Sequence, residues 1–198
     1  KEERAPAEPV DLVLICQQVI GSYRSDEAVE HSIYLEVAGA PVLVPMYARS
    51  ADGGRSFERA RRLSTVPDGD LSSVIHGGYA QAQTFGTLLV DAGGRVHVYW
   101  IDTRYMHDGS DTGALVAVHS QDDGRTFGPE QVLMKAGACP CCQLTAAASA
   151  TGVYLGMRAA EDGFRDSTVR RSRDGGRSFA SPVRLGETRW KIDACPLK

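Results

Sequence analysis

One eight-residue pattern occurs three times in this chain, and it constrains the fold more than any other feature. The octets are residues 50–57, 120–127 and 172–179, which read SADGGRSF, SQDDGRTF and SRDGGRSF. They share the pattern Ser-x-Asp-x-Gly-Arg-Ser/Thr-Phe. Three copies of so constrained a pattern predict a repeat protein in which each repeat is one supersecondary unit.

The sequence around each octet indicates that it is the turn of a β-hairpin. A strand-like run precedes each octet, and a shorter run follows it, as at 130–134 and 182–185. The three preceding runs are residues 41–47, 114–119 and 167–171. Alternating apolar residues between positions 96 and 101 predict a further strand, and no segment has helical periodicity.

The shared residues of the octets suit structural roles in a turn. The Asp can accept hydrogen bonds from backbone N–H groups, and the Gly supplies a positive φ angle. The Ser or Thr hydroxyl ties the ends of the turn, and the Phe is expected to pack into the core of its own unit. We therefore place no catalysis on these residues, which are Ser50, Asp52, Gly54, Phe57, Ser120, Asp122, Gly124, Phe127, Ser172, Asp174, Gly176 and Phe179.

The octets resemble the Asp box, or BNR repeat, of the sialidase superfamily. This resemblance implies an all-β fold, a β-propeller of four-stranded antiparallel blades. Each box lies between the third and fourth strands, on the rim away from the usual active-site face. The second and third octets are 172 − 120 = 52 residues apart, close to the ~40–50 residues of a propeller blade. The first spacing, 120 − 50 = 70, fits one blade with a long insertion.

These spacings give a predicted domain organisation. Residues 1–9 form a flexible arm and residues 10–63 form blade one. Residues 64–188 hold blades two and three, and residues 189–198 begin a further blade. Such an open stack is only part of a six-bladed ring, and it would leave edge strands unpaired. The missing blades must come from residues outside this chain, from a second chain or from self-association.

Composition excludes several classes of partner. The 198 residues carry 22 basic and 25 acidic side chains, a formal net charge of −3, with no basic block to attract nucleic acid. The longest apolar run, Val10 to Ile20, is interrupted by polar residues and is shorter than the ~20 residues of a membrane-spanning helix. The chain starts at Lys1 and reads as a processed or trimmed product.

Four of the five cysteines are expected to cluster. Cys16 lies in an apolar run and reads as a buried strand residue. The others are Cys139, Cys141, Cys142 and Cys195, which lie at matching places one blade apart. Disulfides are the favoured interpretation, with three pairings open. A thiolate site for Cu(I) or Zn, with His76, Met106 or His107 as a further ligand, and a redox-active thiol pair are the alternatives.

The second half of the chain resembles a subgroup of bacterial secreted sialidase-like propellers. The resemblance rests on the Cys-x-Cys-Cys-Gln segment at 139–143, on Arg165-Asp166, and on the Trp-x-Ile-x-x-Cys-Pro segment at 190–196. It implies a secreted or periplasmic location, in which bridges are favoured over free thiols.

A sialidase needs an arginine cluster that clamps a carboxylate, an acid/base Asp and a Tyr–Glu nucleophile pair. The family's early Arg-Ile-Pro motif is absent, and the nucleophilic Tyr normally lies in later blades. The remaining catalytic candidates are Arg104, Arg158, Arg165 and Asp166. Arg104 and Arg158 end second strands of successive blades and could reach one face. The structural alternative is that these groups form salt bridges.

Two functions therefore stand at the level of sequence. The favoured one is a non-catalytic binding or accessory module whose partner is another protein chain, the missing blades or a glycan. The other is a fragment of an exo-sialidase-type glycoside hydrolase that acts on acidic sugars.

Overall fold

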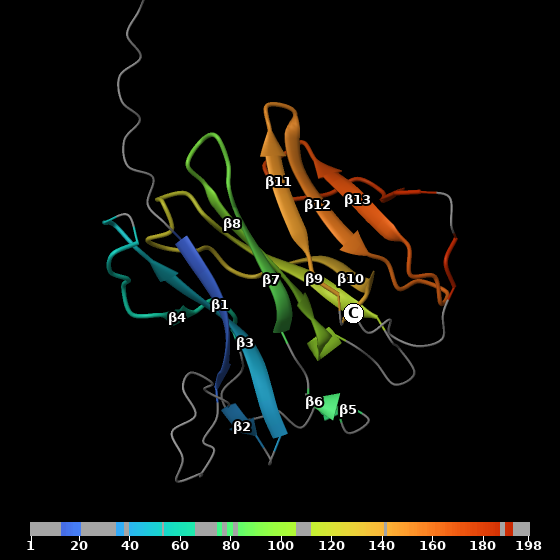
Figure 1. The fold of residues 1–198 in the computed structure, drawn as a ribbon, viewed down its shortest axis with the longest axis horizontal. Coiled ribbons are helices and arrows are strands. Elements are labelled where there is room, and N and C mark those ends of the chain that lie inside the picture. The colour runs from blue at the N-terminus through green and yellow to red at the C-terminus, as the bar shows by residue number, and fades with distance from the viewer. Residues whose placement is uncertain are drawn as a thin grey trace, which may run out of the picture.

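The computed structural model describes residues 13–20, 35–37, 40–52, 54–65, 75–76, 79–80, 83–105, 112–140, 142–186 and 189–191. Side chains are described from residue 45 onward, with gaps that include residues 75–85. The described residues form three four-stranded antiparallel sheets and one two-stranded hairpin (Figure 1). None of their helices is long and apolar enough to cross a membrane.

The first sheet departs from simple sequence order. It contains β1 (Val13–Ile20), β2 (Leu35–Val37), β3 (Ala40–Arg49) and β4 (Arg61–Arg62). One edge of the long strand β3 pairs with β1. Its other edge pairs with β2 at residues 40–42 and with β4 at residues 46–47. Two short strands thus share the edge that one fourth strand was expected to fill.

The second and third sheets keep their strands in sequence order. The second contains β7 (Gln83–Val90), β8 (Val96–Asp102), β9 (Gly113–Ser120) and β10 (Gln131–Ala138). The third contains β11 (Thr145–Ser149), β12 (Gly152–Arg158), β13 (Ser167–Ser172) and β14 (Val183–Arg184). A small hairpin joins β5 (Ile75–His76) to β6 (Tyr79–Ala80), and a short 3-10 helix, η2, spans Thr103–Tyr105.

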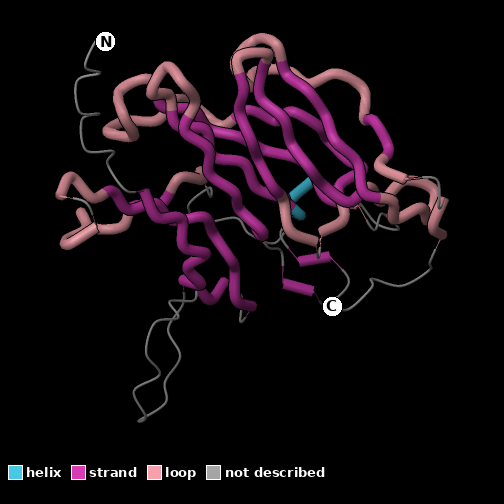
Figure 2. Tube along the Cα trace, turned by 45° about the horizontal axis from the view of Figure 1, so that its top comes forward, coloured by secondary structure: helices cyan, strands magenta, loops and turns pink. Residues whose placement is uncertain are grey.

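The core lies between neighbouring sheets, which stand side by side (Figures 1 and 2). Alternate residues of β8 serve the two interfaces. Val98 and Trp100 pack with Tyr47 of the first sheet, whereas Tyr99 and Ile101 pack with Leu155 and other residues of the third. Because β8 is covered on both faces, all seven of its residues are buried. Each large apolar side chain buried in this way contributes about 1.5–3 kcal/mol.

Each octet is the turn that joins the third strand of a sheet to the fourth. In the first octet the Asp52 carboxylate accepts hydrogen bonds from the backbone N–H groups of Arg55 and Ser56, both at 2.9 Å, and from the Ser56 hydroxyl at 2.6 Å. The hydroxyl of Ser50 accepts a hydrogen bond from the Gly54 N–H at 2.8 Å. Hydrogen bonds from Ser56 and Ser50 lower the pKa of Asp52 to about 2.

The aromatic residues of the octets differ from expectation in what they contact. Phe127 packs edge-on against Tyr47 of the preceding sheet, with ring centroids 4.9 Å apart. Phe179 meets Tyr99 of its preceding sheet in the same way, at 5.9 Å. The Phe therefore joins two sheets as well as closing its own turn. Phe57, in the first sheet, is 41% exposed.

Candidate functional site

The candidate residues lie at the end of the sheets opposite the octet turns. In an antiparallel sheet the connections alternate between its two ends, so the segment between the second and third strands lies opposite the octet. Among the described residues, 103–105 and 112 belong to this segment in the second sheet and 159–166 in the third. Residues 139, 140 and 142–144, which lead into β11, lie at the same end of the sheets.

Arg104 is held within the protein by carboxylates. Its guanidinium contacts Asp102, with Nη2 to Oδ2 at 2.6 Å and Nε to Oδ1 at 3.0 Å. Nη2 also lies 3.2 Å from Oε2 of Glu130, and Nη1 donates to the carbonyl of Thr65 at 2.6 Å. These contacts tie the end of β8 to the start of β10 and to the segment that leaves the first sheet.

The environment of Arg104 explains why it stays charged. Burial alone would lower the pKa of Arg104, but hydrogen bonds and attraction from Asp102 and Glu130 outweigh burial and raise it. Asp102 is fully buried and also accepts a hydrogen bond from the indole N–H of Trp100 at 3.1 Å. A guanidinium saturated in this way acts as a brace between sheets rather than as an open clamp for a ligand carboxylate.

Arg158 lies beside a pocket. Its guanidinium carbon is 5.0 Å from the ring centre of Trp190, an arrangement that favours cation–π attraction. Trp190 is 39% exposed. The pocket has a volume of about 350 Å³, and its lining includes Arg158, Cys142, Thr168 and Leu185. Arg158 thus combines charge, an aromatic neighbour and access to an open volume.

Arg165 and Asp166 organise the loop beneath this pocket. Both are buried, with 5% and 4% exposure. The Arg165 N–H donates to the Trp190 carbonyl at 2.8 Å, and the Trp190 N–H donates to Oδ1 of Asp166 at 2.9 Å. Oδ2 of Asp166 lies 3.1 Å from Nε of Arg184. The described residues 189–191 therefore lie against the loop of the third sheet and hold Trp190 next to Arg158.

Cys139 and Cys142 lie together at the start of the third sheet. Their Sγ atoms are 3.2 Å apart, and both side chains are buried against Ala160. The Cys142 N–H donates to the Cys139 carbonyl at 3.3 Å, which closes a tight turn. Cys141 and Cys195 lie outside the described residues, as do Met106 and His107. Only the backbone of His76 is described, in β5 opposite Tyr79.

The metal prediction is not tested by this structure. Within the described ranges, no group of three or more His, Cys, Asp or Glu side chains is placed to hold a metal ion. Two of the four clustered cysteines fall outside those ranges. Copper or zinc at the cluster therefore stays a prediction, as does a disulfide.

Sequence reasoning missed several polar partners that the fold brings together. Asp102 and Glu130 carry no distinctive signal, because each looks like an ordinary charged residue near a strand end. His97 and His119 lie at matching positions on paired strands, which the sequence alone does not show. The strand alternation around His97 was the available signal, since it placed this residue on the face shared with buried Tyr99.

Comparison with known proteins gives a fold but no family. No protein-family model matches the sequence, and no curated protein matches it. The chain is similar in structure to the Hadza microbial sialidase Hz136, with 19% identity, a TM-score of 0.52, and 72% of this chain and 32% of that chain covered. It is also similar to the intramolecular trans-sialidase from Ruminococcus gnavus, with 14% identity, a TM-score of 0.50, and coverage of 88% and 35%.

A protein of unknown function from Dyadobacter fermentans is a third similar structure, with 16% identity and a TM-score of 0.53. The matched part covers 89% of this chain and 48% of that one. The fold of the described residues is thus sialidase-like, and the chain spans less than half of each of these neighbours. Identities this low speak for the fold alone.

Proposed function

We propose that this chain is part of a secreted or periplasmic sialidase-like β-propeller that acts as a non-catalytic binding module. The observation that carries the proposal is the contrast between two arginines at the end of the sheets opposite the octet turns. Arg104 is saturated by Asp102 and Glu130, whereas Arg158 lines a pocket beside the exposed ring of Trp190. This end of the sheets offers Arg158 and the ring of Trp190 to a ligand.

A glycan with an acidic group is the ligand that this chemistry fits. Arginine pairs with carboxylates through parallel N–H donors, and an exposed tryptophan supplies an apolar face for a sugar ring. The carboxylate-clamping arginine cluster that hydrolysis of sialosides requires is not supported by Arg104, whose donors are already used. Binding without turnover is therefore the function we favour over an exo-sialidase-type hydrolase.

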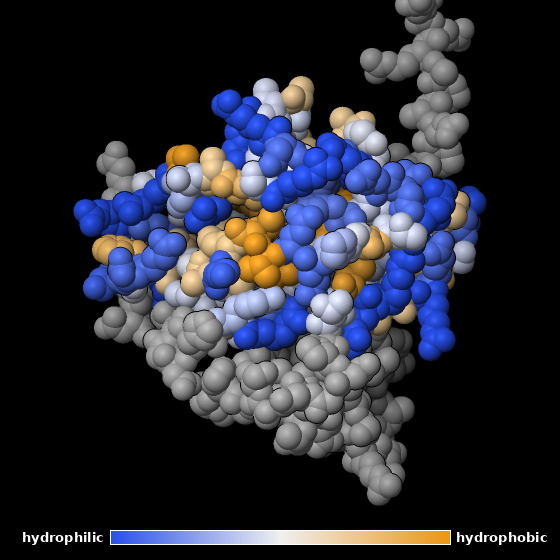
Figure 3. Space-filling model, turned by 180° about the vertical axis from the view of Figure 1, so that it is seen from behind, coloured by the Kyte–Doolittle hydropathy of each residue, from blue (hydrophilic) through white to orange (hydrophobic). Residues whose placement is uncertain are grey.

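The outer sheets support a larger ring of blades, which we take to be six. Phe127 and Phe179 each pack on a tyrosine of the preceding sheet, and Phe57 is 41% exposed where a preceding sheet would lie. At the other end of the row, Val183 and Leu185 are 66% and 53% exposed. Apolar side chains also interrupt the hydrophilic back of the molecule (Figure 3). Further blades or another protein chain would cover such surfaces.

The cysteine cluster is proposed to be structural or metal-binding. The 3.2 Å approach of the Cys139 and Cys142 sulfurs suits either a bridge or two thiolate ligands of Cu or Zn. Intact mass measured with and without reduction and alkylation separates the two states. A mass that includes a metal ion under native conditions would assign the cluster to Cu or Zn, and a mass gain only after reduction would assign it to bridges.

Titration of the full chain with sialyllactose, beside an assay with a fluorogenic sialoside, tests the function. We expect binding without turnover, and at least about a tenfold loss of affinity in Arg158→Ala. Arg171→Ala is the matched control, because Arg171 stacks on Tyr154 in the same sheet in a similar way. Turnover above background would make the chain a hydrolase fragment. Equal affinity of the two variants would remove Arg158 from the site.

A further inference from the structure

A second polar site lies at the end of the sheets that carries the octet turns. It lies between the second and third sheets, away from Arg158. Nδ1 of His97 and Nδ1 of His119 are 2.9 Å apart. Nε2 of His97 is 3.2 Å from Oδ2 of Asp91, which also binds the guanidinium of Arg95 at 2.6 Å. The three titratable groups therefore form a hydrogen-bonded series from Asp91 through His97 to His119.

The hydrogen bonds of this series determine which imidazole nitrogen of each histidine carries the proton. Burial raises the pKa of Asp91, but hydrogen bonds from Arg95 and His97 outweigh burial and lower it to about 2. Asp91 is therefore an ionised acceptor, so Nε2 of His97 carries the proton that it donates. Nδ1 of His97 must then accept, and Nδ1 of His119 must donate to it. Nε2 of His119 is left as a bare lone pair, and this buried atom has no hydrogen-bond partner among the described residues.

The surroundings keep His119 neutral at physiological pH. Burial, followed by repulsion from His97, Arg177 and Arg95, lowers the pKa of His119 to about 4, against a smaller opposing attraction from Asp174. A buried acceptor that lacks a donor is unfavourable. A ligand with a hydrogen-bond donor would relieve this at Nε2.

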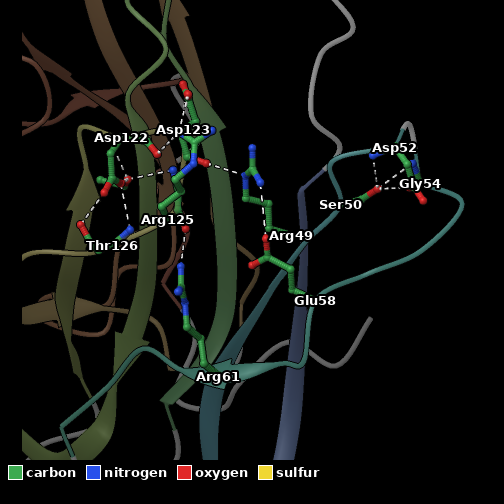
Figure 4. Close-up of polar contacts among 12 residues, drawn as sticks. Arg49, Ser50, Asp52, Gly54, Glu58, Arg61, Asp122, Asp123, Arg125 and Thr126 are labelled. Carbon is green, nitrogen blue, oxygen red and sulfur yellow. Dashed lines mark hydrogen bonds and ion pairs between the residues drawn. The ribbon is translucent and has the colours of Figure 1, made fainter.

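The corresponding place between the first and second sheets is filled by arginine. Arg49 donates from Nε to the carbonyl of Asp123 at 3.0 Å, and Arg61 donates to the carbonyl of Gly124 (Figure 4). Both carbonyls belong to the second octet, so two arginines of the first sheet bind the turn of the next sheet.

Shorter side chains take these positions in the second sheet. Arg49 and His119 each stand just before the Ser of an octet. Arg61 pairs with Tyr47, and Gln131 pairs with Ala117 at the equivalent register. The shorter His119 and Gln131 leave a pocket of about 160 Å³ facing the third octet.

Two guanidinium groups line this pocket, those of Arg95 and Arg177. The charge of Arg95 is balanced by Asp91, and Arg177 is exposed at the rim. At Gly175 and Gly176 the third octet contributes backbone without side chains. A Cβ added to Gly175 would lie 2.7 Å from Nη1 of Arg95, and one added to Gly176 would lie 3.2 Å from Nδ1 of His97.

We propose that this pocket binds a small tetrahedral oxyanion that carries a proton at neutral pH, namely hydrogen phosphate. Its P–OH group donates to Nε2 of His119, and its other oxygens accept hydrogen bonds from Arg95 and Arg177. Sulfate has the same shape and charge but no proton at neutral pH, so it would place an oxygen lone pair against that of His119.

The test is calorimetric titration of the full chain with inorganic phosphate and with sulfate at pH 7.5. Phosphate is expected to bind at least about tenfold more tightly than sulfate. The difference should narrow as the pH falls toward the pKa of His119, because the protonated ring becomes a donor to sulfate. Methyl phosphate has a second pKa of about 6 and therefore no P–OH group at pH 7.5, so it should bind as weakly as sulfate. Methyl phosphate binding as tightly as phosphate would contradict the contact between P–OH and His119.

Three variants keep the proposal falsifiable. Arg177→Ala should weaken phosphate binding, whereas Arg125→Ala, at the same position of the second octet, should not. His119→Gln should bind sulfate better than the unaltered chain does, because an amide can donate. Equal binding of the two anions at pH 7.5, or equal effects of the two arginine variants, would overturn the proposal. Binding of guanidinium ion in place of phosphate would show that the pocket takes a cation, as its counterpart between the first two sheets does.

Discussion

Removal of the Arg104 side chain is the perturbation whose outcome the structure fixes most closely. Arg104→Ala would leave the fully buried Asp102 carboxylate with two donors, the indole N–H of Trp100 and the backbone N–H of residue 104. Breaking a buried ion pair by removing one partner destabilises a protein by about 3–5 kcal/mol. Because two donors remain, we expect about 3 kcal/mol, or a fall in Tm of roughly 6–12 °C for a chain of this length.

The assay is equilibrium unfolding in urea, followed by the tryptophan fluorescence of Trp100, which is buried, and Trp190, which is 39% exposed. Arg125→Ala is the control, because the pair of Arg125 with Asp123 is more than half exposed on both sides and should add little to stability. In the double variant with Asp102→Asn, the loss should be smaller than the sum of the two single losses, because no buried charge is left unpaired.

Two results would refute this reasoning about Arg104. The first is a loss of stability no larger than that of Arg125→Ala. The second is unchanged stability together with loss of sialyllactose binding, which would make Arg104 a ligand-binding residue instead of a brace between sheets.

Three further predictions concern the octets and the interface above them. Gly176→Ala should destabilise the protein by at least about 1 kcal/mol more than Gly186→Ala. Both glycines have a positive φ angle, but only at Gly176 would an added Cβ collide with the hydroxyl of Tyr99. Equal losses of stability in urea unfolding would contradict this. Tyr99→Phe should leave stability within about 1 kcal/mol or raise it, since the buried hydroxyl has no hydrogen-bond partner in the described part of the chain; a larger loss would show that this hydroxyl is bound. The pKa of Asp52 is lower in the folded state, so the stabilising effect of its ionised carboxylate is complete above about pH 4 and is lost as the pH falls toward 2. The Tm measured from pH 6 to pH 3 should therefore fall less in Asp52→Asn than in the unaltered chain.

The repeated octets and the strand alternation predicted much of the local structure. The predicted strand over residues 167–171 differs from β13 by a single residue, and the one over 114–119 lies within β9. These elements are predictable because turn chemistry and side-chain alternation are local properties. The split edge of β3 was not predictable, since it depends on which distant segments find room beside that strand.

The candidate site was less accessible to sequence reasoning. Arg104 and Arg158 occupy similar places at strand ends, yet one is saturated by carboxylates and the other borders a pocket. Asp102 is a local partner of Arg104, but Glu130 is 26 positions from Arg104 and meets it only in the folded chain. Long-range partners of this kind leave no periodic signal in the sequence.

The arginines that bind the second octet have a consequence for how the repeats assemble. Arg49 and Arg61 match the carbonyl groups of the turn on the adjacent sheet, whereas His119 and Gln131 at the next junction do not reproduce this match. Each junction therefore recognises its own neighbour, although the three octets are nearly identical. A sheet docked at the wrong junction would place arginines where no room exists or leave a hollow unfilled. The variation between junctions thus makes the order of the repeats a property of their contact surfaces as well as of the chain that connects them.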